Sequence, residues 1–193
     1  MTTKHYGVPE GMVGSRRGER MFPQEEGLKP YAVGLYQRDG VPAACLLLQE
    51  RAGVDVNVLL MAVWMAACKD RALDEADARR ARLRVVDWHQ EVVRPLRAVR
   101  RRLKQGPHPA PSDETHRLRA ELQKLEISAE LIELDQLEML AEEMPERESA
   151  GTLRDNAMAG MLAVVAAFAS RPADEQERDA MGTIVAAATG PTS

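Results

Sequence analysis

The chain has 193 residues, of which 29% are charged and only 4% are aromatic. Helix-forming residues dominate, and β-branched residues rarely alternate with polar ones, which disfavours strands. The formal net charge of -4 excludes a general attraction to nucleic acid or anionic lipid, so polyanion binding would need a local basic patch. We therefore predict an all-α protein, arranged as an irregular multi-helix bundle.

The sequence indicates a cytoplasmic protein without a membrane segment. No run of 18 uncharged apolar residues is present, and no apolar segment follows the basic residues near the N-terminus, as a secretory signal would require. Cys45 and Cys68 lie in separate apolar stretches, which is typical of reduced thiols in a core.

The N-terminal residues 1–27 mix Gly, Pro, Arg and Glu without an apolar period, so we predict a disordered tail. The following chain has helical periodicity with clear ends. Gly53 closes one predicted helix, and Asp55 is the expected N-cap of the next. Helices are expected over residues 30–38, 42–52, 56–70 and 74–105, the last kinked or split at Pro95.

The second half of the chain begins with a proline-rich connector over residues 106–112. Ser112 then caps a predicted long helix, about 113–144, in which a stripe from Leu118 to Ile132 and a second from Ile127 to Met144 are both expected to pack. We predict a helical domain over residues 28–144. Residues 148–190 form a further helical pair, either docked or separate. The predicted core is Leu46, Leu47, Val56, Leu59, Leu60, Val63, Trp64 and Ala67.

Three strings carry a family resemblance: GVPAACLLLQERAGVDVNVLLMAVWMA, WHQEVVRPLRAVRRRLK and LRAELQKLEISAELIELDQLEML. Together they resemble a bacterial family of conserved helical proteins of unknown function, over about residues 28–144. The resemblance implies a helical fold for this region and brings no catalytic residue or cofactor with it.

A basic patch is the strongest local feature of the sequence, with six cations in eleven residues. Arginine forks suit bidentate contact with carboxylate or phosphate groups, so the patch is a candidate surface for an acidic protein or a phosphate-bearing ligand. The alternative, which we favour, is pairing with the acidic face of residues 121–143. The patch lacks stacking aromatics, which disfavours nucleic acid. Its members are Arg94, Arg97, Arg100, Arg101, Arg102 and Lys104.

Candidate chemistry is weak elsewhere. Glu126, Glu130 and Glu133 share one side of the long helix, but the Glu-x-x-His pairs of helical metal sites are missing, so we interpret these residues as a solvated acidic face. No nucleophilic triad, phosphate-binding loop or dinucleotide fingerprint occurs in the sequence. We predict no catalytic residue, no metal ligand and no cofactor.

Polar residues interrupt the most apolar region of the chain. Buried polar groups need partners, so we expect them either to bond across the turn between two core helices, which we favour, or to line a small pocket near two tryptophans. The candidate pocket residues are Gln49, Asp55, Asn57, Trp64, Trp88 and His89.

The interpretation that follows is a non-enzymatic interaction or regulatory protein that docks an acidic partner or a phosphate-bearing ligand through its arginines. An enzyme or carrier with a small apolar ligand between core helices is the alternative. Long amphipathic helices also leave a homodimer open, since one chain can cover the apolar stripe of another.

Overall fold

A computed structural model describes residues 27–145, 147 and 151–190. The described residues form eight α-helices and one five-residue π-helix, with no strand among them, which confirms the all-α prediction. No helix in these ranges has the length and apolar character needed to cross a membrane. The predicted tail lies outside the described residues apart from Gly27. The elements are α1 (Leu28–Tyr36), α2 (Val41–Ala52), α3 (Val56–Cys68), α4 (Glu75–Trp88), η1 (His89–Val93), α5 (Arg94–Arg102), α6 (Asp113–Glu143), α7 (Leu153–Ala169) and α8 (Glu175–Thr189).

Short-range signals determine where these helices begin and end. Gly53 ends α2 in the left-handed region at a φ of 66°, where a side chain would be strained. Asp55 then caps α3 by accepting a hydrogen bond from the Asn57 N–H at 2.8 Å. Ser112 and Thr115 form a capping box at the start of α6. The predicted caps are therefore confirmed.

Helix α3 lies at the centre of the fold, and its residues from Asn57 to Ala67 are all buried. Most of the predicted core is confirmed there, but the prediction for α2 was wrong. Leu46 is 42% exposed and Leu47 is only partly buried, and Val56, the first residue of α3, is also only partly buried. The reason is that α2 lies at the outside of the bundle and packs mainly against α8, so a stretch that is apolar all round still has one solvent face.

Helices α7 and α8 pack on the rest of the molecule. Helix α7 lies along α3 and α4, and α8 lies along α2. Their side chains, including Met161 and Ile184, belong to the same hydrophobic cluster as α3. The close approach of α7 to α3 depends on Gly160, because a Cβ at this position would lie 3.3 Å from the Ala62 Cβ.

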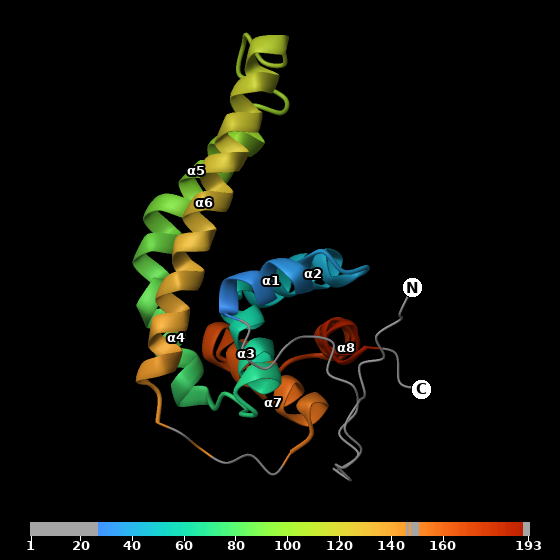
Figure 1. The fold of residues 1–193 in the computed structure, drawn as a ribbon. Helices are drawn as coiled ribbons and strands as arrows, with labels where there is room; N and C mark the ends of the chain where they lie inside the picture. The colour runs from blue at the N-terminus through green and yellow to red at the C-terminus, as the bar shows by residue number, and fades with distance from the viewer. Residues whose placement is uncertain (1–26, 146, 148–150, 191–193) are drawn as a thin grey trace, which may run out of the picture.

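Helices α5 and α6 form an antiparallel hairpin whose distal half extends away from the other helices (Figure 1). One predicted inner stripe of α6 was therefore wrong. Leu118 and Leu125 are 51% and 57% exposed, because only α5 lies beside this part of α6. Further along the same stripe Ala129 is buried, whereas Ile132 is 45% exposed. The second stripe faces the body at Leu134 and Leu137, although Ile127 is exposed.

Substitution of two helical glycines, Gly160 and Gly182, is expected to have opposite effects on the free energy of unfolding. The change Gly160→Leu should lower the free energy of unfolding by about 1–3 kcal/mol, because the added side chain overpacks the contact with Ala62. The change Gly182→Ala, at a site where a Cβ meets nothing within 4 Å, should raise it by about 0.5–1 kcal/mol through helix propensity. Urea unfolding followed by circular dichroism measures both, and equal effects would contradict the packing of α7 on α3.

Candidate functional site

The turn between α2 and α3 brings two polar side chains into the interior. Because Asp55 is the N-cap of α3, its carboxylate lies at the positive end of the helix dipole. Asn57, two residues later, is buried, and its side-chain amide is directed at α6. The expected bonding was across the turn between the two neighbouring core helices, whereas Asn57 bonds to Glu133 of α6, 76 residues further along the chain.

A wide helical turn positions His89 opposite Asp55 and Asn57. Pro95 has no N–H, and the chain before it forms the π-helix η1, in which the Arg94 N–H bonds to the His89 carbonyl oxygen. Of the two predicted outcomes at Pro95, a kink or a split, the split does not occur, because the helix continues from α4 through η1 into α5. Trp88, at the end of α4, donates its indole N–H to the Ala129 carbonyl oxygen at 3.1 Å, which ties this turn to α6.

Helix α6 supplies three carboxylates to the site, and the interpretation of these residues as a solvated acidic face was wrong. Glu126 and Glu133 are 5% and 1% exposed, and Glu130 is half-buried. The helical spacing of four and three residues correctly places them on one side, but that side faces α3, η1 and α5 rather than solvent.

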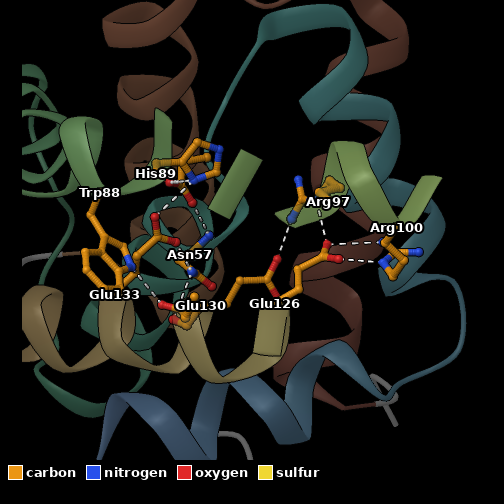
Figure 2. Close-up of polar contacts among 10 residues, drawn as sticks. Asn57, Trp88, His89, Arg97, Arg100, Glu126, Glu130 and Glu133 are labelled. Atoms are coloured by element: carbon orange, nitrogen blue, oxygen red, sulfur yellow. Dashed lines mark hydrogen bonds and ion pairs between the residues drawn. The ribbon is translucent and has the colours of Figure 1, made fainter. Parts of the chain in front are cut away.

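Asp55, His89 and Glu133 converge on one point, as Figure 2 shows in part. His89 Nδ1 lies 2.9 Å from Asp55 Oδ2 and 3.0 Å from Glu133 Oε1. Asn57 donates to the other oxygen of Glu133, Oε2, at 2.7 Å, and to the Glu130 carbonyl oxygen at 3.2 Å. An imidazole nitrogen therefore faces two buried carboxylate oxygens that come from different helical segments.

The electrostatics of this cluster are strongly perturbed. Burial disfavours a charged imidazole, yet the adjacent Asp55 and Glu133 carboxylates outweigh it and raise the pKa of His89 to about 10. Burial also raises the pKa of Glu133, and the Asp55 carboxylate adds to this rise while His89 opposes it. The cluster thus concentrates negative charge that requires a cation, here the His89 imidazolium.

A second network joins α5 to α6 beside this cluster (Figure 2). Arg97 donates from Nε to Glu126 at 2.8 Å and also pairs with Glu130, and Arg100 donates from Nε to Glu126 at 2.5 Å. Pairing within the molecule, the alternative that we favoured for the basic patch, therefore describes two of its six members. The hydrogen bonds from Arg100 and Arg97 outweigh the effect of burial and lower the pKa of Glu126.

The other four members of the patch are exposed on α5 and its C-terminal end. Among the described residues, the side chains of Arg94, Arg101, Arg102 and Lys104 make no hydrogen bond or ion pair. Val99 is 49% exposed and α5 has no buried residue, because among the described elements only α6 and η1 pack against it.

A cleft of about 470 Å³ opens where α5, η1 and α4 pass the turn between α2 and α3. Asp55 and His89 form part of its wall, which also includes four arginines and Phe168 of α7. Of the predicted pocket residues, Gln49, Asp55 and His89 line this cleft, whereas Asn57, Trp64 and Trp88 do not. Trp64 is only 2% exposed within the core, and Trp88 lies at the surface on the side of α6. The arginines that line the cleft are Arg82, Arg94, Arg97 and Arg101.

Residues 28–137 match the model of a family described as "Protein of unknown function (DUF2390)". The match covers more than half of the chain. The protein belongs to the DUF2390 family. Neither curated proteins nor solved structures match the chain. The convergent cluster, the arginine network and every wall residue of the cleft except Phe168 lie within the DUF2390 region.

Sequence reasoning singled out Asp55, Asn57 and His89 as pocket residues but missed Glu133, the partner of both Asn57 and His89. The available signal was the inward spacing of the carboxylates on α6, which we had interpreted as solvent-facing. Arg82 was also missed. Its guanidinium donates to the Ala167 carbonyl oxygen at 2.9 Å and stacks 5.1 Å from the centre of the Phe168 ring, a contact that depends on the packing of α7.

The lowered pKa of Glu126 predicts a pH dependence. A carboxyl whose folded pKa lies below its unfolded value contributes stability above the unfolded pKa, and this contribution is lost as the pH falls through the folded pKa. The change Glu126→Gln should therefore cost stability near neutral pH, and the difference from the wild type should shrink between about pH 5 and pH 3. Denaturant unfolding at several pH values measures it, and a difference that is constant with pH would contradict the ion pairs.

Proposed function

We propose that this DUF2390 protein is a binding module that takes a small phosphate-bearing molecule into the cleft between α5, η1 and the turn from α2 to α3. The observation that carries the proposal is the position of Arg94 and Arg101. Both line the cleft and are exposed, and neither has a side-chain partner among the described residues. Two free guanidinium groups on one concave wall suit an anion with several oxygens.

Two of the four cleft arginines have partners within the protein and two have none, and this difference supports the proposal. Arg97 is held by Glu126 and Glu130, and Arg82 is held by the Ala167 carbonyl oxygen and the Phe168 ring. These two groups are rigid parts of the wall, whereas Arg94 and Arg101 keep all of their donors for a ligand. The wall carries four arginines against the two acidic residues Glu50 and Asp55, so its formal charge favours an anion.

The shape of the surface favours a small molecule over an acidic protein. The cleft volume lies within the range of about 300–1,000 Å³ that is typical of small-ligand pockets. An acidic protein would instead be expected to use the whole exposed row of α5, including Arg102 and Lys104, which do not line the cleft. A small ligand in the cleft would therefore depend on Arg94 and Arg101, whereas an acidic protein would depend on Arg102 and Lys104 as well.

The apolar-ligand alternative has less support. It places the ligand near Trp64 and Trp88, but neither ring lines the cleft, and Trp64 is packed within the core with the Lys69 ammonium group 5.3 Å from its ring centre. The four arginines of the cleft wall also fit an anion better than a hydrocarbon.

Calorimetric titration with inorganic pyrophosphate, at low and at physiological salt, tests the proposal. The double change Arg94→Gln and Arg101→Gln should weaken binding by at least about tenfold, because each charge-assisted hydrogen bond contributes about 1.5–3 kcal/mol. The matched control changes Arg102→Gln and Lys104→Gln, which remove the same charge from the end of α5 and the turn after it, outside the cleft. It should alter the affinity by less than about threefold.

Three outcomes would overturn this proposal. The first is the absence of pyrophosphate binding by the wild-type protein. The second is tighter binding of citrate than of pyrophosphate, which would indicate that the cations prefer a polycarboxylate. An equal loss of affinity in the two double variants would indicate a diffuse charged surface, as an acidic protein partner would use. Arg97 and Arg100 are unsuitable for this test, because their removal leaves Glu126 unpaired.

A further inference from the structure

We propose that Asp55, His89 and Glu133 form a binding site for one divalent transition-metal ion. The three side chains come from the start of α3, the start of η1 and the middle of α6. This inference does not depend on the binding of a phosphate-bearing ligand, because it concerns the metal alone and different side chains.

The distances within the cluster are those of neighbouring metal ligands. Two ligands at right angles, each about 2.1 Å from a cation, lie about 3.0 Å from one another. His89 Nδ1 lies 2.9 Å from Asp55 Oδ2 and 3.0 Å from Glu133 Oε1, and all three atoms lie within 4.8 Å of one another. An ion could therefore be accepted by movement of side chains, without movement of the helices.

The ligand types indicate the class of metal. An imidazole nitrogen with two carboxylate oxygens suits Mn²⁺, Fe²⁺, Co²⁺ or Zn²⁺, whereas Mg²⁺ and Ca²⁺ prefer sites made of oxygen atoms. Three protein ligands also leave coordination positions open to water or to an anion. Because Asp55 and His89 line the cleft, such positions are accessible from it.

An unpartnered buried atom provides an independent indication of a ligand. Asp55 is 5% exposed, and its Oδ1 accepts the capping hydrogen bond from the Asn57 N–H. Its Oδ2 is buried, faces His89 and has no partner with hydrogen-bond geometry. A single Nδ1 proton cannot serve two carboxylates fully, so one buried oxygen is left unsatisfied, a defect that a metal ion would correct.

The surroundings hold the ligands in position. Asn57 donates to Glu133 Oε2 at 2.7 Å, which leaves Oε1 directed at His89, and the backbone N–H of the same residue fixes Asp55. Carboxylate ligands in metal sites are commonly oriented by such hydrogen bonds. The π-helix that begins at His89 is itself a feature found often at functional sites.

The test uses the full chain, stripped of metal with EDTA and titrated with Mn²⁺ while electron paramagnetic resonance measures the free ion. We expect one Mn²⁺ per chain. The changes Asp55→Asn, His89→Gln and Glu133→Gln should each weaken binding by more than about 100-fold, because even outer-shell substitutions cost 10–100-fold. Asp55→Asn retains a good helix N-cap, so its effect reports on the charge rather than on the fold.

A matched control is Glu126→Gln, which removes another buried carboxylate of α6 that pairs with arginines instead. It should leave the affinity for Mn²⁺ unchanged within about threefold. The imidazole nitrogen coupling in the pulsed spectrum of bound Mn²⁺ should be present in the wild type and absent in His89→Gln, which identifies the ligand without reference to folding.

Two results would overturn the proposal. One is the absence of binding tighter than millimolar by the wild-type protein for Mn²⁺, Co²⁺ and Zn²⁺ alike. The other is binding that survives both Asp55→Asn and Glu133→Gln, which would indicate adventitious surface sites. The Arg94→Gln and Arg101→Gln double variant should still bind Mn²⁺, so failure of the phosphate proposal and failure of the metal proposal are distinguishable.

Discussion

The structure depends on the burial of carboxylates from α6. A carboxylate removed from water is destabilising unless a cation or several donors face it. Glu126 meets this need through Arg97 and Arg100 of α5, and Glu133 meets it through His89 of η1 and Asn57 of α3. Breaking such a buried pair by removal of one partner typically costs about 3–5 kcal/mol. These pairs therefore determine how the helical rod from α4 to α5 lies on α6, and apolar packing alone would specify this less uniquely.

The π-helix decides which cations reach which carboxylates. One extra residue in a helical turn rotates all that follows by about 100° relative to an unbroken α-helix. With η1 in place, His89 faces α3 and α6, while Arg97 and Arg100 face Glu126 about two turns further along. Pro95 favours this arrangement because it cannot donate the hydrogen bond that a regular α-helix needs there.

The C-terminal helices extend the wall of a cleft that otherwise belongs to the DUF2390 region. Phe168 of α7 lies outside that region, yet it stacks on Arg82 and lines the same cleft as His89 and Arg94. Stacking on an aromatic ring restricts a guanidinium group without neutralising it. Helices α7 and α8 thus contribute to the core through Met161 and Ile184, and α7 contributes to the cleft through Phe168.

The sequence by itself determined the helices and their ends, because caps, prolines and left-handed glycines act within a few residues. Gly53, Asp55 and Ser112 are found where their chemistry predicted. The periodicity also predicted that Glu126 and Glu133 share a side of α6. Only the tertiary structure decided that this side is buried and that His89, 44 residues before Glu133, lies opposite it. The same limit explains Leu118 and Leu125, which have core periodicity but lie in the part of α6 that only α5 accompanies. Periodicity specifies the faces of a helix, whereas burial depends on which distant segments pack against each face.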